Sequence, residues 1–379
     1  MIYLDNAATT YPKPEAVYVA MDEANRQYSV NAGRGSYRKA KEASEKIALL
    51  KSELRKLIHT DNETPVVIAS SITVALNQII NGMDFHAGET VYVSPYEHNA
   101  VARTLYHVSK KKGFSIEEIP IDEETFEISL DALRYRFSKH KPAAVFCTHV
   151  SNVTGYILPV AEIFEEAKKY DCKTILDTAQ SLGLVELDVR KLKVDIVAFA
   201  GHKSLYGPLG IGGFINVGRI ELDSFLVGGT GSDSLNLEMP NGMESMYEPA
   251  SANIVAISGL LVALKNLDSN MYEQEHSLSV YLIDKLREIS GVTVYGWNKV
   301  ESSIGVVSFS VDGMDSNDVA YILDADYDIA VRSGYHCAPF IHKYLHDESN
   351  KGTIRVGIGR YTKFEELELL CRAISEIGE

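Results

Sequence analysis

Short apolar runs alternate with amphipathic stretches between about residue 65 and residue 216. This alternation is typical of parallel strands covered by helices on both faces, because strands buried on both sides read as continuous apolar runs. The apolar runs lie at 66–69, 90–93, 143–146, 174–176, 195–199 and 211–215. The pattern therefore predicts an α/β fold with a mostly parallel sheet wrapped by helices.

The segments on either side of this region have a different pattern. Apolar residues recur at helical spacing from Ser36 to Ile58, which predicts a long helix with one buried stripe, and Pro12 and Pro14 lead into an earlier helix that ends near Tyr28. After about residue 265 the pattern predicts a helix at 272–289, strands at 292–295 and 305–311, a helix at 316–325 and a final helix from residue 364. We therefore predict a large domain over residues 30–262. Residues 1–29 and 263–379 are expected to form a smaller α+β domain, against which the N-terminal helix packs.

Composition narrows the class of protein. The chain has 379 residues, of which 45% are hydrophobic and 23% charged, as in ordinary globular proteins. A net charge of −15 argues against a broad nucleic-acid or anionic-membrane surface, since those partners require a basic face. The first residues lack a charged leader followed by an apolar stretch, and Ser258 and Gly259 interrupt the longest apolar run. We therefore expect a cytoplasmic protein with neither a membrane nor a nucleic acid as partner.

The four cysteines are widely spaced and form no CxxC pair, so neither a metal site nor a disulfide framework is predicted. Three of them occupy places that are usual for small buried residues, namely Cys147, Cys172 and Cys371. Cys337 differs, because Gly334 and Pro339 mark a loop around it, and its neighbours His336 and Arg332 favour the thiolate. Cys337 is therefore the candidate nucleophile.

A second candidate group follows the run at 195–199. Lys203 lies in a turn bounded by Gly201 and Gly207. A lysine that forms a Schiff base with an aldehyde cofactor, together with a loop cysteine, suggests amino-acid chemistry through pyridoxal phosphate. Asp177 ends another predicted strand, at the sheet edge where such folds bind ligands, and its carboxylate can keep a pyridinium nitrogen protonated. Taken alone, Lys203 is more often a solvated charge and Asp177 a turn or cap residue.

Two predicted helix starts add candidate binding groups. Ser70 and Ser71 follow the first strand of the region, where backbone N–H groups attract phosphate; the alternative is a plain helix cap. His98 opens the next helix, and its flat ring can stack on an aromatic cofactor; a surface histidine at a helix end is the alternative.

With these residues together, the sequence resembles the cysteine desulfurase and selenocysteine lyase family, which belongs to the class V aminotransferase group of pyridoxal-phosphate enzymes, fold type I. The resemblance covers nearly the whole chain. Its motifs are Tyr3-Leu-Asp-Asn-Ala-Ala-Thr-Thr, residues 33–35, Glu97-His98-Asn99, Ser151-Asn152-Val153, Asp177-Thr-Ala-Gln180, Gly201-His202-Lys203 and 332–338. Several motifs in order are far more specific than any one of them.

The resemblance implies a role for each matching residue. Lys203 carries pyridoxal 5'-phosphate, Asp177 pairs with the ring nitrogen, Gln180 bonds the phenolic oxygen and His98 stacks on the ring. The phosphate is expected to be held by Ser70, Ser71 and His202, with Ser251 reaching over from the second subunit of a homodimer. Arg355, assisted by Asn152, is expected to clamp the substrate carboxylate.

The implied reaction starts from L-cysteine or its selenium analogue. Lys203 removes the Cα proton, Cys337 attacks the substrate sulfur, and alanine and a persulfide on Cys337 result, with His98 moving the thiol proton. The short span from Cys337 to Arg355 implies a compact catalytic loop, which a sulfur-acceptor protein has to approach.

The chain departs from the family pattern in its phosphate site. Ala200 stands where relatives often have a serine, which removes one expected phosphate hydrogen bond, and Ala250-Ser251-Ala252-Asn253 replaces a common Gly-Thr-Pro-Asn. Losing one bond to a charged group costs roughly 1.5–3 kcal/mol, so cofactor affinity is expected to fall without vanishing. Two other readings stay open: transamination or β-elimination on the same scaffold, and a non-catalytic relative.

Overall fold

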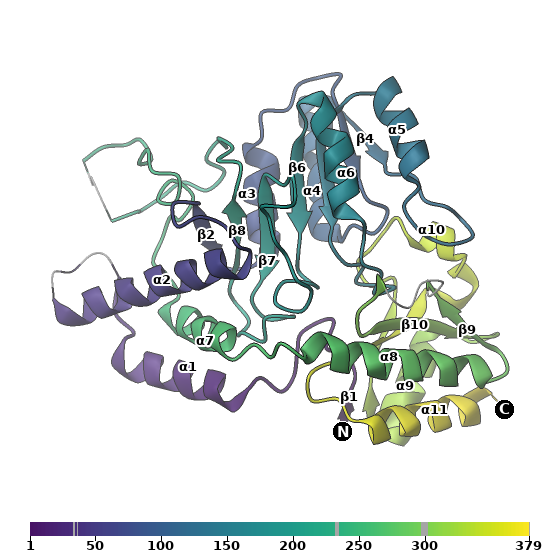
Figure 1. Cartoon of the computed structure of the whole chain (residues 1–379). Helices are drawn as coiled ribbons and strands as arrows, with labels where there is room; N and C mark the ends of the chain where they lie inside the picture. Colours follow the sequence, from purple (N-terminus) through teal and green to yellow (C-terminus); the bar gives the residue numbers. More distant parts are fainter. Residues whose placement is uncertain (33–34, 36, 232–234, 297–301, 379) are drawn as a thin grey trace.

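The computed structural model describes residues 1–32, 35, 37–231, 235–296 and 302–378 (Figure 1). Gly33 and Arg34 of the family motif at 33–35 lie outside the described residues. The central sheet has seven strands in the order β2-β8-β7-β6-β5-β3-β4. Their bounds are β2 (Val66–Ala69), β3 (Thr90–Val93), β4 (Ser115–Glu118), β5 (Pro142–Thr148), β6 (Lys173–Asp177), β7 (Ile196–Ala200) and β8 (Gly212–Asn216).

The sheet is mostly parallel, which confirms the prediction. Every neighbouring pair runs parallel except those of β8, which is antiparallel to both β2 and β7. Strand β4 was not predicted from the sequence, because Ser115, Glu117 and Glu118 make it mostly polar. It lies at the edge of the sheet, where burial does not demand apolar side chains.

Helices cover both faces of this sheet (Figure 1). One face packs on α2 (Arg38–Leu57), α5 (Leu130–Lys139), α6 (Val160–Ala167) and α7 (Ile254–Lys265). The other face packs on α3 (Ile72–Gly82) and α4 (Asn99–Lys112). Along β5, Val145 faces the first core while Ala144 and Phe146 face the second. This double burial explains why the strands read as continuous apolar runs.

A smaller antiparallel sheet of order β12-β13-β10-β9 lies beside the large one. Its strands are β9 (Val292–Tyr295), β10 (Val306–Val311), β12 (Arg332–Gly334) and β13 (Thr353–Gly357). The helices α8 (Met271–Glu288), α9 (Ser316–Tyr327) and α11 (Phe364–Gly378) share a core with it, around Leu282, Phe309 and Leu367. The helix α10 (His342–Leu345) lies between β12 and β13 in the chain. The α+β pattern expected after residue 265 is thus confirmed.

The N-terminal segment is shared between the two regions. Strand β1 (Ile2–Tyr3) pairs with β11 (Ile329–Ala330), which precedes β12 in the chain, but helix α1 (Glu15–Gln27) packs along α7. The prediction that this helix packs on the small domain is therefore wrong. A Cβ on Gly259 of α7 would lie 2.8 Å from Cγ of Met21 in α1. The absence of a side chain at Gly259 therefore allows α1 to pack closely against α7. The predicted domain boundaries themselves stay a prediction.

No helix among the described residues is both long enough and apolar enough to cross a bilayer.

Candidate functional site

The sheet topology gathers the candidate residues at one edge. Strands β3, β5, β6 and β7 are parallel, so the segments after their carboxyl ends meet there. Asp177 is the last residue of β6, and it pairs in register with Ala198 of β7, five residues before Lys203. His98 caps the start of α4 after β3. The order of the strands, rather than the order of the motifs, therefore places these side chains together.

The amine of Lys203 is enclosed by charged groups of the site. Burial lowers its pKa to about 8; the charges of Asp177 and Cys337 act in the opposite direction, while those of Arg355 and Arg332 lower it further. Asp177 is buried, and burial raises its pKa, against the opposing effects of a hydrogen bond from Ala179 N and the charge of Lys203. Lys203 consequently has an appreciable neutral, nucleophilic fraction near neutral pH.

His98 is held as a neutral ring with a defined tautomer. Burial lowers its pKa to about 4, with the charge of Lys203 as the next cause. Its Nδ1 accepts a hydrogen bond from Ala100 N at 3.0 Å, so the ring proton sits on Nε2. The neighbouring Glu97 is fully buried and accepts from Ser94 Oγ at 2.6 Å and Thr148 N at 2.5 Å. Burial raises the pKa of Glu97 to about 8, so a neutral acid anchors the turn that presents His98.

The turn that carries His202 and Lys203 is fastened by the N-terminal segment. The carbonyl of His202 accepts hydrogen bonds from Thr9 Oγ1 at 3.1 Å, Thr10 N at 3.2 Å and Lys13 Nζ at 2.7 Å. Burial lowers the pKa of the Lys13 amine to about 7. The ring of His202 is neutral because burial lowers its pKa to about 4, and its buried Nδ1 has no hydrogen-bond partner among the described residues. A buried ring nitrogen without a partner is available to form a hydrogen bond with a ligand atom.

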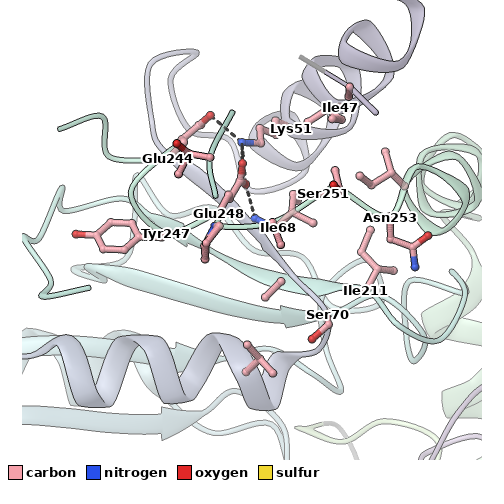
Figure 2. Close-up of a pocket in the computed structure, with 18 of the residues that line it drawn as sticks. Ile47, Lys51, Ile68, Ser70, Ile211, Glu244, Tyr247, Glu248, Ser251 and Asn253 are labelled. Carbon is pink, nitrogen blue, oxygen red and sulfur yellow. Dashed lines mark hydrogen bonds and ion pairs between the residues drawn. The ribbon is translucent and has the colours of Figure 1, made fainter. Parts of the chain in front are cut away.

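Of the three hydroxyl groups predicted to bind phosphate, one caps a helix and two line a cavity. Ser71 caps α3, accepting from Val74 N at 3.2 Å, as the plain-cap alternative expects. Ser70 and Ser251 are exposed and line one cavity of about 580 Å³ (Figure 2). Both lie in a single chain; a contribution of Ser251 from a second subunit stays a prediction.

An ion-pair cluster lines the same cavity as Ser70 and Ser251 (Figure 2). Lys51 of α2 contacts Glu244 at 2.8 Å and Glu248 at 2.9 Å. The same two carboxylates accept hydrogen bonds from Val66 N and Ile68 N of the edge strand β2. These bonds satisfy backbone donors that an edge strand otherwise leaves open.

The candidate residues for substrate binding are engaged with the protein itself. Arg355 is buried; its Nη2 lies 2.8 Å from Asp5 Oδ1 and its Nη1 donates to Asn152 O at 3.0 Å, while its buried Nε has no partner among the described residues. The side-chain amide of Asn152 donates to His336 O at 2.7 Å. Gln180 donates to Ala7 O at 2.9 Å, which leaves its second amide hydrogen for a ligand.

The cysteine loop is held in a strained shape. His336 and Cys337 both adopt left-handed backbone conformations, with φ of 44° and 58°, which cost roughly 1–2 kcal/mol each for side-chain-bearing residues. The carbonyls of residues 335–337 are all bound: Tyr335 O by Ala338 N and His342 Nε2, His336 O by Asn152, and Cys337 O by Asn99 N at 2.6 Å. Arg332 Nη2 lies 3.6 Å from Cys337 Sγ. The loop thus fixes the thiol next to the guanidinium of Arg332.

The other three cysteines have the inert character expected of them. Burial raises the pKa of Cys147 well above its usual value, that of Cys172 to about 12 and that of Cys371 to about 11. None of the four forms a disulfide in the described chain.

Several residues of the site were not singled out from the sequence. They are Asp5, which pairs with Arg355; Glu97, which anchors the His98 turn; and Lys13, which binds the His202 carbonyl. Asp5 and Glu97 lie inside motifs that were recognised without a role for them. Lys13, between Pro12 and Pro14, gave no signal of its own.

The residues present suit a flat aldehyde cofactor with a phosphate. The orphaned Nδ1 of His202 and the exposed hydroxyl of Ser70 at the start of α3 offer contacts for a phosphate. The amine of Lys203 offers the covalent attachment, and the buried carboxyl of Asp177 offers a partner for a ring nitrogen. The donor set therefore fits pyridoxal 5'-phosphate in kind.

Comparison with known proteins yields full-length matches. A family model described as aminotransferase class-V matches residues 2–370. A probable cysteine desulfurase of Pyrococcus abyssi is 32% identical over 389 residues, covering 100% of this chain and 94% of the relative. A probable cysteine desulfurase of Halalkalibacterium halodurans is 30% identical, covering 100% of this chain and 93% of the relative. The apo structure of cysteine desulfurase from Thermococcus onnurineus NA1 has a TM-score of 0.89 and 31% identity, covering 99% of this chain and 94% of that chain.

Proposed function

The chain belongs to the class-V aminotransferase family, and we propose that it is a cysteine desulfurase that uses pyridoxal 5'-phosphate to convert L-cysteine to L-alanine and a persulfide on Cys337. The observation that carries the proposal is that the Cys337 thiol, the Lys203 amine and the guanidiniums of Arg332 and Arg355 meet in one site. Arg332 Nη2 lies 3.6 Å from Cys337 Sγ, and the charges of Cys337, Arg332 and Arg355 all shift the pKa of Lys203. Relatives that match over the full chain support it.

When bound, pyridoxal phosphate supplies an electron sink that makes the Cα–H bond of an amino acid acidic. Lys203 attaches the cofactor and later accepts the Cα proton, tasks that suit an amine whose pKa burial lowers to about 8. Asp177 holds the ring nitrogen protonated. Arg355 binds the substrate carboxylate through its Nε, which has no partner among the described residues, while Asp5 keeps the guanidinium in place.

The sulfur step uses the fixed loop. The Cys337 thiolate, which lies next to Arg332, attacks the substrate sulfur; the substrate Cβ–S bond breaks, an S–S bond forms at Cys337, and Cβ takes up a proton to give alanine. His98 carries its proton on Nε2, so the neutral ring is a donor on that side. We include in the proposal a homodimer, a cytoplasmic location and transfer of the persulfide sulfur to an acceptor protein.

The test is alanine release from L-cysteine by the cofactor-loaded protein, with mass spectrometry of Cys337. We expect alanine and one added sulfur on Cys337 in the wild type. Cys337→Ala should keep the bound cofactor and lose the added sulfur, and Lys203→Ala should lose turnover altogether. Undiminished alanine release from L-cysteine by Cys337→Ala would overturn the nucleophile assignment.

The second candidate function is a selenocysteine lyase on the same site. It gains support if the Cys337→Ala variant releases alanine from selenocysteine but not from cysteine, because selenium is a better leaving group and can be released without attack by a protein thiol. Transamination would instead appear as a keto acid product, and a non-catalytic relative as a protein that never attaches the cofactor.

A further inference from the structure

A groove of about 1000 Å³ opens beside Cys337, on the side bounded by α4 and the cysteine loop. Its wall includes two exposed tyrosines, Tyr106 at 59% and Tyr335 at 48% exposure, next to Arg103 and Arg332. Tyrosine and arginine are the residues most enriched in protein-recognition surfaces, because they offer large contact area with few rotatable bonds or a fixed fork of donors. The groove is larger than a single amino acid needs.

The charges of the groove do not cancel. Lys343 is neutralised by Glu118 at 2.6 Å, whereas Arg103 is exposed and forms no hydrogen bond or ion pair with any described residue. The guanidinium of Arg332 forms a hydrogen bond only with the Cys337 sulfur among the residues that the structure describes. With Glu348 as the remaining acid, and with Cys337 itself left out of the count, three cations face two anions, a net charge of +1 in a chain of −15. A local positive groove on an acidic protein selects for a partner with negative charge at that point.

We propose that this groove receives an acceptor polypeptide whose thiol is flanked by carboxylates, with Arg103 and Arg332 as the cations that recognise them. This rests on the proposed function, since it concerns the discharge of the Cys337 persulfide. The acceptor thiolate attacks the outer sulfur of the persulfide and the Cys337 Sγ–S bond breaks. The electron pair stays on Sγ as the Cys337 thiolate, and the acceptor becomes the persulfide, so the step needs no oxidant or reductant.

The test measures single-turnover discharge of persulfide-loaded protein by three tripeptides, in which a central cysteine is flanked by aspartates, by glycines or by lysines. The wild type should react faster with the aspartate peptide than with the lysine peptide. Arg103→Glu should slow the aspartate peptide by about tenfold and speed the lysine peptide severalfold. Comparing variant with wild type for each peptide cancels the differences in thiol pKa between the peptides.

The matched control is Lys111→Glu, which makes the same charge change at an exposed position of the same helix but outside the groove. Its rates should equal those of the wild type. Equal effects of both variants would show a response to total charge and overturn the proposal, as would a ratio of Arg103→Glu to wild-type rate that is the same for all three peptides. If 3-mercaptopropionate and 2-mercaptoethanol were discriminated as strongly as the peptides, the polypeptide assignment would be overturned in favour of a small acid.

Loading the protein from L-cysteine and, in parallel, from inorganic polysulfide separates this proposal from the proposed function. A persulfide that forms only from polysulfide contradicts desulfurase activity, yet the discharge experiment still reports on the groove.

Discussion

Lys203 shows how one buried residue sets a pH dependence. With its pKa lowered from 10.5 to about 8 by burial, about a tenth of the amine is neutral at pH 7, and the neutral form is the nucleophile. We therefore expect the rate at which added pyridoxal phosphate attaches to the apoprotein to rise between pH 6.5 and 9, with a midpoint near 8. The visible absorbance of the attached cofactor measures it. Lys203→Ala should show no attachment, and a midpoint near 10 would refute the buried amine.

Glu275 on α8 is a buried acid outside the reaction. Burial raises its pKa from 4.5 to about 8, and it accepts a hydrogen bond from Tyr206 OH at 3.3 Å. The folded state therefore holds a proton that the unfolded state releases above pH 4.5, so this residue lowers the free energy of unfolding progressively as the pH rises from about 4.5 to 8. Glu275→Gln should remove that loss and stabilise the protein at pH 8 by roughly 2–4 kcal/mol.

Thermal or denaturant unfolding of wild type and Glu275→Gln at pH 5 and pH 8 measures this difference. The gap between the two proteins should be much smaller at pH 5. Glu273→Gln, at an exposed position of the same helix, serves as the control. A gap that does not change with pH would show that packing, not ionisation, separates the variants.

Single residues with a chemical task were predictable from the sequence, and their supports were not. Lys203, Asp177 and Cys337 carry reactive groups in recognisable surroundings, so residue type and motif suffice to single them out. Asp5 and Glu97 act through partners about 350 and 50 residues away, Arg355 and Thr148. Those contacts depend on the order of the strands, which no local pattern contains.

At the scale of elements, the cysteine loop depends on a buried pair from α10 and the turn after it. His342 Nδ1 lies 2.5 Å from Asp347 Oδ2, and its Nε2 lies 3.0 Å from Tyr335 O. Each ring nitrogen therefore faces an oxygen atom, and the ring bridges the Asp347 side chain and the Tyr335 carbonyl. The Asp347 carboxylate thus fixes the orientation in which His342 faces the Tyr335 carbonyl.

Asp347→Asn is expected to release this carbonyl. The asparagine side chain can present its NH2 group to Nδ1 of His342, so the ring loses its fixed orientation toward Tyr335 O, and the left-handed residues 336 and 337 lose one support. We expect the rate of persulfide formation on Cys337 to fall about tenfold, because a nucleophile that is slightly misplaced loses most of its advantage. Cofactor attachment at Lys203 should remain as in the wild type.

Quenched-flow sampling with mass spectrometry of Cys337 gives the loading rate, and absorbance gives the attached cofactor. Asp326→Asn, the same substitution at an exposed position of α9, is the control and should behave as the wild type. A parallel loss of cofactor attachment in Asp347→Asn would point to general destabilisation instead of loop positioning.

The pattern of apolar positions predicted elements that bury a clear apolar face and missed strands without one. Strand β9 and the start of α11 lie where the sequence places them, because both bury an apolar face. Strand β4 is polar and was missed. The edge strand β2 was recognised, but its bonds to Glu244 and Glu248 were not, since carboxylates about 180 residues away satisfy its donors.

At the scale of the whole molecule, the alternation of strands and helices predicted the layers but not which strands are neighbours. The packing of α1 on α7, and not on the small domain, shows where prediction from the sequence pattern ends. Its amphipathic pattern predicts a buried face without naming the surface that buries it, and α7 provides that surface through the small residue Gly259.

The proposed homodimer makes a further prediction at this scale. Exposed apolar side chains gather in the segment after β8, among them Val227 at 71% and Leu237 at 101% exposure, and Leu226 of this segment lines the cavity that holds Ser70 and Ser251. Large exposed apolar groups in one segment are typical of an interface. If a second copy covers this segment, dimer formation and phosphate binding are coupled, because the interface borders the phosphate cavity.

We therefore expect Val227→Asp to shift the protein toward monomer in analytical ultracentrifugation and to weaken pyridoxal phosphate binding at the same protein concentration. Leu369→Asp places the same charge at a 45% exposed apolar position on α11, away from the cavity, and should leave both properties unchanged. The two effects must move together: cofactor affinity of the Val227→Asp protein should recover at high protein concentration, where mass action restores the dimer. A monomeric variant that binds the cofactor as tightly as the wild type would separate the phosphate site from the interface and remove the need for Ser251 of a second subunit.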